Sequence, residues 1–418
     1  MKKLLAIIIL WVPLAAFALK PIMIISFVSG NTSIDRSGTD LIEYRVTNNS
    51  GQTLQNMTVI ANAGLEGSAA SAVTLSSSNC GTLAPNAFCT FFVSITGNEK
   101  LPNSFTLAPA VCAFNNQICS RPDGSNREDI TVITQAYVTN TQTGIVDVCN
   151  VNTTNGNLTP CVTVGPTFFT PTSIALNPSL TFAYVTNFAN GTVSVCPIKA
   201  DGTFNPCTDA LEDQEDPLFI ALNPAGTIAY LVTDSSNATT VKKCGIGIDG
   251  ILTCSRTGED FSGPSSIAIH PNGKFAYVTN AGSNSVSLCS VSSGGESEGE
   301  LTDCAVTGDI AFTMPSGIAL NPSGTKAYIT EVSFIFEAGF IVCSVNSTTG
   351  ALSSCAPVDI EASNPGGVAV MLDGSRVFLT DSGLDDVISC PLNSDGGIDG
   401  VCTTVGIGFS GPMGIALN

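Results

Sequence analysis

The chain has 418 residues, 40 of them glycine and 22 proline, and a formal net charge of −19. An acidic chain of this kind repels phosphate backbones, so nucleic acid is excluded as an expected partner. Strand-forming residues are abundant and no long stretch has helical spacing, which indicates an all-β fold with many tight turns. Sixteen cysteines beside a single histidine favour disulfides over a Cys/His zinc site.

Residues 1–18 have the pattern of a secretory signal peptide. Lys2 and Lys3 precede an apolar run from Leu4 to Leu14, and Ala16-Phe17-Ala18 is a small-x-small cleavage site. The run is too short to span a membrane, and no later segment is long enough either. We therefore expect a cleaved signal peptide, no transmembrane segment and a monomeric protein that is periplasmic or secreted.

Residues 19–130 lack the repeats found later in the chain. The segments 41–47 and 54–60 alternate like half-buried strands, and the turn residues 48–51 lie between them. The segment from Ser78 to Val93 resembles one that is common in Ig-like modules of bacterial surface proteins. The resemblance and the size predict an Ig-like β-sandwich, which a polar stretch at 115–129 would link to the rest.

A five-residue string recurs six times after residue 130, at intervals of 46 to 51 residues. It reads Ala-Tyr-Val-Thr-Asn three times, at 136–140, 183–187 and 276–280, and has weaker copies that begin at Ala229, Ala327 and Val377. A second string, of the Ile-Ala-Leu-Asn-Pro kind, precedes five of these copies. It begins at Ile174, Ile220, Ile267, Ile318 and Val368, and its sixth copy, Gly414 to Asn418, ends the chain. Each repeat is therefore one unit that begins with two strands.

Two cysteines follow these strands in every repeat, and turn residues such as Asn155-Gly156 and Asp201-Gly202 lie midway between them in most repeats. Cysteines placed evenly about a hairpin turn face each other within disulfide range. This spacing predicts one disulfide per repeat, and two more are expected near the N-terminus, where four cysteines allow three connectivities. The expected pairs are Cys149–Cys161, Cys196–Cys207, Cys244–Cys254, Cys289–Cys304, Cys343–Cys355, Cys390–Cys402, Cys80–Cys89 and Cys112–Cys119.

Four short strands in a repeat of 40 to 50 residues are typical of a propeller blade. The first repeat lacks its first strand, and residues 412–418 supply a spare one, so the two should pair and close the ring. The sequence thus predicts a six-bladed β-propeller over residues 131–418. The strings resemble the YVTN and NHL-type propeller repeats of bacterial secreted and cell-surface proteins. That resemblance implies the fold and leaves the function open.

The last residue of each Ala-Tyr-Val-Thr-Asn string is a candidate metal ligand. Some six-bladed propellers hold a central Ca²⁺ or Zn²⁺ and act on lactones or esters, and side-chain oxygens at this position would suit Ca²⁺. The same position recurs in every blade, however, which favours a turn-stabilising role. His270, the only histidine, occupies an Asn position and is interpreted as a turn residue. The candidate ligands are Asn140, Asn187, Asp234, Asn280, Glu331 and Asp381.

An apolar loop in the fifth repeat is the most specific candidate for a contact surface. Phe334, Ile335 and Phe336 lie in a connection that is longer than its counterparts, and insertions on one face of a repeat array often mark a binding face. The alternative is a strand extension that packs on its neighbour. The sequence thus favours a non-enzymatic binding or scaffold protein for a protein or glycan partner, without a cofactor. The alternative function is a metal-dependent lactonase or esterase with its site at the propeller axis, where Ca²⁺ would be the cofactor.

Overall fold

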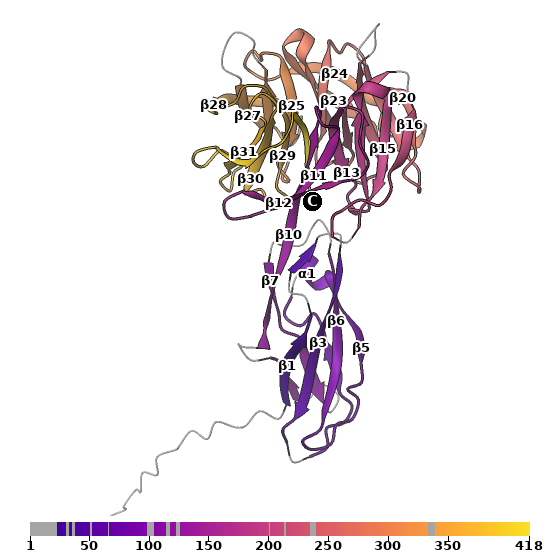
Figure 1. Ribbon diagram of the computed structural model, residues 1–418, viewed down its shortest axis with the longest axis vertical. Coiled ribbons are helices and arrows are strands. Elements are labelled where there is room, and N and C mark those ends of the chain that lie inside the picture. The colour runs from indigo at the N-terminus through magenta and orange to yellow at the C-terminus, as the bar shows by residue number, and fades with distance from the viewer. Residues whose placement is uncertain are drawn as a thin grey trace, which may run out of the picture.

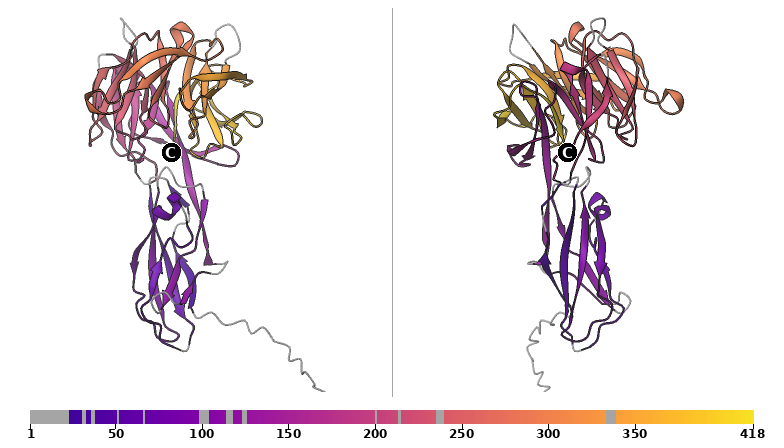
Figure 2. Two further views of the ribbon diagram at one scale, coloured as in Figure 1. Left: turned by 180° about the vertical axis from the view of Figure 1, so that it is seen from behind. Right: turned by 45° about the vertical axis from the view of Figure 1, so that its right-hand side comes forward.

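The computed structural model describes residues 23–30, 33–35, 38–50, 52–65, 67–97, 104–113, 118–122, 126–199, 201–212, 215–234, 240–332 and 339–418. A narrow N-terminal β module stands below a wider ring of sheets (Figure 1), and the two further views show the same arrangement (Figure 2). Within the described ranges, no helix has both the length and the apolar character needed to cross a membrane. The predicted signal peptide lies outside the described residues.

The N-terminal module consists of short sheets around one apolar core. One sheet has the order β1 (Met23–Ser29), β3 (Thr39–Asn48), β6 (Phe88–Thr96) and β5 (Val73–Ser78), and another has the order β4 (Thr58–Ile60), β8 (Ala110–Ala113) and β9 (Ile118–Ser120). The helix α1 (Gly67–Ala72) precedes β5. The rings of Tyr44 and Phe91 stack at 5.4 Å in the core. The predicted strand 41–47 lies within β3, whereas only the end of the predicted segment 54–60 is a strand.

A single strand, β10 (Glu128–Asn140), joins the module to the ring. Its first half pairs with β7 (Ser104–Leu107) and with β2 (Ser33–Asp35) of the module. From Thr134 onward it pairs with β11 (Ile145–Val151) of the ring. The polar stretch 115–129 was expected to be a linker, but it contains β9 and the start of β10. The connection between the two parts is therefore a continuous hydrogen-bonded strand.

The ring is built from four-stranded antiparallel sheets, which we number as blades in chain order. Blade 1 contains β33 (Pro412–Leu417), β10, β11 and β12 (Leu158–Val164). We call the four strands of a blade a, b, c and d from the inner circle outward. In the other blades they follow one another in this order along the chain. They are β13 (Pro171–Leu176), β14 (Phe182–Asn187), β15 (Thr192–Pro197), β16 (Thr208–Glu212); β17 (Asp216–Leu222), β18 (Ile228–Asp234), β19 (Thr240–Ile246), β20 (Leu252–Arg256); β21 (Pro264–Ile269), β22 (Phe275–Asn280), β23 (Ser285–Val291), β24 (Leu301–Thr307); β25 (Pro315–Leu320), β26 (Lys326–Glu331), β27 (Gly339–Val345), β28 (Leu352–Val358); β29 (Pro365–Val370), β30 (Arg376–Asp381), β31 (Asp386–Pro391), β32 (Thr403–Ile407).

The first strands of these sheets contact one another in a closed circle. Each of β13, β17, β21, β25 and β29 contacts the first strand of the next blade, and β33 contacts both β29 and β13. The C-terminal strand pairs with β10 in an antiparallel register that places Ala136 opposite Leu417. This pairing is the one that the missing first strand of the first repeat predicts. It leaves the inner circle without an open edge.

The two outer strands of each blade are joined by a disulfide. The structure forms all eight expected cysteine pairs, and the six that the spacing predicts connect strand c to the following strand or turn in the propeller. No cysteine among the described residues is free. Each disulfide closes a short loop and stabilises the fold by roughly 2–3 kcal/mol, chiefly by restricting the unfolded chain.

The recurrent tyrosine of strand b explains part of the repeat. The hydroxyls of Tyr137, Tyr230, Tyr277 and Tyr328 each donate to a carbonyl in the c–d turn of the next blade, at 2.6 to 2.9 Å. These rings are almost fully buried. Burial, followed by the nearby Glu300 and Glu298 carboxylates, raises the pKa of Tyr230 to about 12, so its hydroxyl keeps the donated proton at neutral pH. These bonds thus connect neighbouring blades on the face of the ring where the a–b and c–d turns lie.

Small residues allow the inner strands to approach one another closely on one side of the ring. A Cβ atom added to Gly317 would lie 2.3 Å from the carbonyl oxygen of Gly366, and one added to Gly367 would lie 2.5 Å from that of Met413. Real Cβ atoms do not tolerate such contacts with backbone. The same strand position is Ser173 in blade 2.

We expect the tyrosine bonds between blades to be measurable as stability. Tyr277→Phe leaves the carbonyl of Gly350 without its donor and should lower the free energy of unfolding by about 1–2 kcal/mol. Tyr184 provides the matched control, because its buried hydroxyl has no hydrogen-bond partner among the described groups. Tyr184→Phe should therefore cost nothing. Denaturation midpoints of both variants would test this, and equal losses would contradict the role assigned to the bond.

The close contact at Gly367 gives a second stability prediction. Gly367→Ala should destabilise the protein by about 1–3 kcal/mol, because the added methyl meets the Met413 carbonyl. Gly245→Ala is the control: Gly245 lies in β19, and no atom lies within 4 Å of its added Cβ. That change should be neutral or slightly stabilising, since glycine weakens a strand. A Gly367→Ala protein that melts with the parent would show that the inner strands have free space.

Candidate functional site

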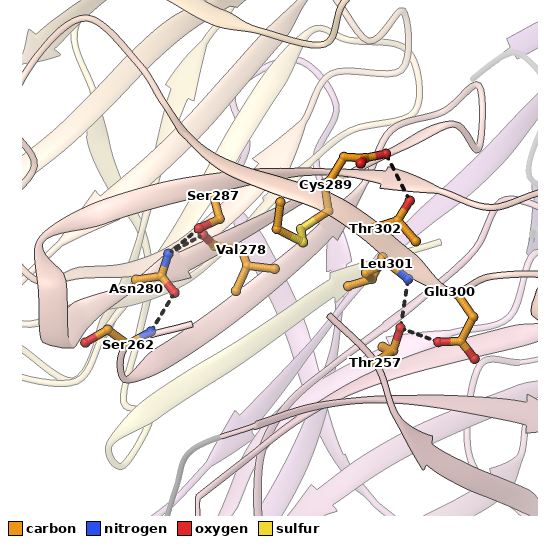
Figure 3. The surroundings of a disulfide bond; sticks show 11 residues. Thr257, Ser262, Val278, Asn280, Ser287, Cys289, Glu300, Leu301 and Thr302 are labelled. Carbon is orange, nitrogen blue, oxygen red and sulfur yellow. Dashed lines mark hydrogen bonds between the residues drawn. A yellow bond between two sulfur atoms is a disulfide. The ribbon is translucent and has the colours of Figure 1, made fainter. Parts of the chain in front are cut away.

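The residues that end strand b each hold a loop of their own blade in place. The oxygen of Asn140 accepts the backbone N–H of Ser410 at 2.9 Å, and that of Asn187 accepts the N–H of Phe169 at 3.2 Å. The remaining bonds of this kind run from Ser262 to Asn280, from Thr313 to Glu331, and from Ser363 and Asn364 to Asp381. Figure 3 shows Asn280 between Ser262 and Ser287. In five blades, therefore, this side chain fastens the loop that leads into strand a.

The central metal site considered for these residues stays a prediction, and the contacts that the residues make lie within their own blades. Strand b is the second strand of each sheet, so its end lies one strand away from the inner circle. The oxygens of the five side chains above accept hydrogen bonds from backbone N–H groups, each within its own blade. Asp234 ends β18 opposite Asp216. Across the described residues, no group of three or more His, Cys, Asp or Glu side chains could hold a metal ion.

Blade 3 replaces the common bond with an ionic cluster. Glu215, which precedes β17, accepts a hydrogen bond from Thr233 at 2.8 Å and contacts Lys242 at 3.0 Å and Arg256 at 2.9 Å. Burial alone would raise the pKa of Glu215, but these partners together hold it at about 2. The carboxylate thus stays charged and forms ion pairs with both Lys242 and Arg256.

A cavity of about 990 Å³ lies between blades 3 and 4, and we call it the 3–4 cleft. Its acidic side chains are exposed, as for Glu259, Asp260 and Asp303, or paired, as for Glu300, which contacts Lys243 at 2.7 Å. The Lys243 contact lowers the pKa of Glu300. Thr257 donates to Glu300 and accepts the N–H of Leu301, beside the Cys289–Cys304 disulfide (Figure 3). None of these carboxylates is a buried base.

A second cavity, of about 800 Å³, lies between blades 5 and 6, and we call it the 5–6 cleft. Glu331 at the end of β26 and Gly339 at the start of β27 form one side. Thr403 and Thr404 of β32 lie on the other. A Cβ atom added to Gly339 would lie 2.7 Å from Oε2 of Glu331, so glycine at this position leaves room for the glutamate side chain. The remaining wall is mainly apolar, with Phe340, Ile341, Val358, Ile360, Ile388 and Val401.

Glu331 differs from the other loop-fastening residues because it lines a cavity. Its side chain is 9% exposed, and Oε1 accepts the N–H of Thr313 at 2.7 Å. Burial raises the pKa of this carboxyl, and the bond from Thr313 offsets only part of the effect. A carboxylate that is both buried and open to a cavity is a stronger base than one in water.

A second buried carboxyl, Asp386, lies behind the wall of the 5–6 cleft. Thr404 donates to its Oδ2 at 2.8 Å, whereas its Oδ1 is buried without a partner among the described residues. Asp386 and Ile388 are two residues apart on β31, and Ile388 pairs with Thr404, so all three share one face of the sheet. Burial raises the pKa of Asp386, and the carboxylates of Asp381 and Asp385 raise it further.

Four further residues were singled out in the sequence, three in an apolar loop and one histidine. Phe334, Ile335 and Phe336 lie outside the described residues, between Glu331 and Gly339. His270 is a turn residue, as the repeat predicts: its Nδ1 accepts the N–H of Asn272, so Nε2 carries the proton that it donates to the carbonyl of Gly324 at 3.0 Å. Sequence reasoning singled out Glu331 but not Asp386. The two consecutive acidic residues Asp385 and Asp386, where strand c of blade 6 begins, were the feature of the sequence that could have indicated it.

Comparison with known proteins identifies the propeller. The family model described as a lactonase, a 7-bladed β-propeller, matches residues 132–389. It names the lactonase family where the repeats resembled the YVTN and NHL types, and it specifies seven blades, whereas the described residues form six four-stranded propeller sheets. No curated protein matches the chain.

Solved structures are similar to this chain at low sequence identity. A chain of the nidogen/laminin complex superposes with a TM-score of 0.52 at 12% identity, covering 68% of this chain and 98% of that one. The periplasmic gluconolactonase PpgL of Pseudomonas aeruginosa superposes with a TM-score of 0.49 at 15% identity, covering 77% of this chain and 97% of that one. Because the family model covers more than half of the sequence, this chain belongs to the lactonase family of β-propellers.

Proposed function

We propose that this protein hydrolyses a lactone ring, and that the reaction takes place in the 5–6 cleft. The observation that carries the proposal is the match of the lactonase family over residues 132–389. The geometry adds a place for the chemistry, since among the described residues Glu331 is a carboxylate that is both buried and in the wall of a cavity. The binding-scaffold alternative rests on Phe334–Phe336, which lie outside the described residues.

In the proposed reaction, Glu331 acts first as a base and then as an acid. Its carboxylate takes a proton from a water molecule whose oxygen attacks the lactone carbonyl. The tetrahedral intermediate then breaks the bond between the former carbonyl carbon and the ring oxygen. The ring oxygen leaves with the proton returned by Glu331, which gives a hydroxy acid and regenerates the carboxylate. The backbone N–H of Thr313 keeps Glu331 oriented toward the cleft.

Three features of the architecture belong to the same proposal. We infer that this family member closes its ring with six blades, because the contacts of the inner strands return from β29 through β33 to β13. The N-terminal module, residues 19–130, is proposed to be Ig-like on the basis of its small antiparallel sheets and shared core. The eight disulfides favour an oxidising compartment such as the periplasm or the cell exterior.

The hydrolase proposal is tested by removing the base. Glu331→Gln keeps an oxygen for the N–H of Thr313 but cannot accept a proton, so kcat for lactone hydrolysis should fall by about 10²- to 10⁴-fold. Since burial disfavours the charge of Glu331, we expect the melting temperature at pH 7 to be at least that of the parent. Glu259→Gln in the 3–4 cleft removes the same charge and should leave kcat unchanged.

The pH profile gives an independent readout. Because the pKa of Glu331 is raised above its ordinary 4.5, the base form appears only as the pH rises through that higher value. The rate should therefore climb on a limb that begins above pH 4.5 and that Glu331→Gln lacks. Loss of activity on chelation and its return with Ca²⁺ would instead favour the central-metal alternative. Full activity in Glu331→Gln would exclude the 5–6 cleft.

A further inference from the structure

The 5–6 cleft carries acidic groups without a balancing cation. Glu331, Asp359 and Glu361 line it, and Asp386 lies behind Thr404. No lysine, arginine or histidine is among its described lining residues. The electrostatic potential in this cavity is therefore negative whether or not a ligand is present.

The basic residues of the propeller lie elsewhere. The sequence after residue 130 has seven of them. Three are in blade 3, where Lys242 and Arg256 are paired with Glu215, and Lys243 with Glu300. Lys274, Lys326 and Arg376 lie at or just before the start of a b strand, whereas Glu331 ends one, and Lys199 is in a c–d turn. Five residues of strand span roughly 17 Å, so Lys326 on the same strand is too far away to neutralise Glu331.

The uncharged part of the cleft is suited to an apolar group. Phe340, Ile341 and Ile388 form its buried wall, each at most 3% exposed. Val358 and Ile360 are half-buried, and Val401 is exposed at 81%. A ligand that covered Val358, Ile360 and Val401 would gain free energy from the removal of their exposed apolar surface from water. The polar groups are thus gathered at Glu331 and the threonines, with apolar surface beside them.

We propose that the 5–6 cleft selects an uncharged lactone that carries an alkyl substituent and rejects phosphorylated or carboxylated lactones. The inference rests on the proposed lactonase function and names its substrate class. The ring would lie beside Glu331 and the alkyl group against Val358, Ile360 and Val401. A phosphate group would enter a cavity whose acidic groups repel it and which offers no cation to bind it. Selection is then exerted by repulsion as much as by contact.

The test compares three lactones on the purified full-length protein. δ-Decalactone is uncharged and bears an alkyl chain, glucono-1,5-lactone is uncharged and polar, and 6-phosphoglucono-1,5-lactone is anionic. We expect kcat/KM to be at least about tenfold higher for δ-decalactone than for the phosphorylated lactone at low salt, with the gap narrowing as salt screens the repulsion. A phosphorylated or polar lactone that is hydrolysed as well as δ-decalactone would overturn the inference.

Charge variants locate the selection. The double variant Asp359→Asn/Glu361→Gln should lower the ratio of kcat/KM for the alkyl over the phosphorylated lactone by several-fold, because it removes two repelling charges from the rim. Glu259→Gln/Asp260→Asn removes two charges from the 3–4 cleft and should leave that ratio unchanged. Equal effects of the two double variants would mean that the net charge of the protein, and not the 5–6 cleft, causes the selectivity.

Binding separates this inference from the proposed activity. If none of the lactones is hydrolysed, the proposed function fails, but the substrate class is still tested by the shift in melting temperature. δ-Decalactone should raise the melting temperature and 6-phosphoglucono-1,5-lactone should not, and Val401→Asp should abolish the shift. The absence of a shift with δ-decalactone, or an equal shift with the phosphorylated lactone, would overturn the inference.

Discussion

Hydroxyl groups on the second strand of five of the described blades bond to the next blade and hold the ring together. Tyrosine hydroxyls bind the turn of the next blade at one face. Nearer the other end of the strand, Thr330 and Thr380 donate to the carbonyls of Gly366 and Met413 on the next inner strand, both at 2.7 Å. Both kinds of residue come from one five-residue string. The string is thus preserved along the chain because it makes contacts between sheets as well as strand structure within them.

The sequence was sufficient to predict the repeated four-stranded sheets of the propeller, because each repeat encodes its own strands, turns and cysteines. The C-terminal closing strand followed from a missing strand in the first repeat, and the cysteine pairs followed from their symmetry about the turns. The connection between the two parts could not be predicted in this way. Residues 115–129 are polar, but β10, which begins within them, obtains hydrogen bonds from β2 and β33 far away in the chain, and no local pattern indicates such partners.

The candidate site was only partly accessible from sequence. Asn, Asp and Glu at the end of strand b form a visible series, but their position could not show that each accepts a backbone N–H from its own blade. Glu331 belongs to that series, but it also lines a cavity, beside Gly339. The cavity arises from the packing of β27 and β28 against β31 and β32. Such a site depends on two blades, and a repeat pattern describes only one.

The continuous strand β10 has a mechanical consequence. Its first residues are held by β7 and β2, and its last by β11 and by the C-terminal strand β33. A displacement of the N-terminal module therefore travels along one extended backbone into blade 1, where it loads rows of hydrogen bonds in shear. A flexible tether would dissipate such a force. Here the module acts as a lever arm on β10, which is the strand that pairs with the closing strand β33 (Figure 1).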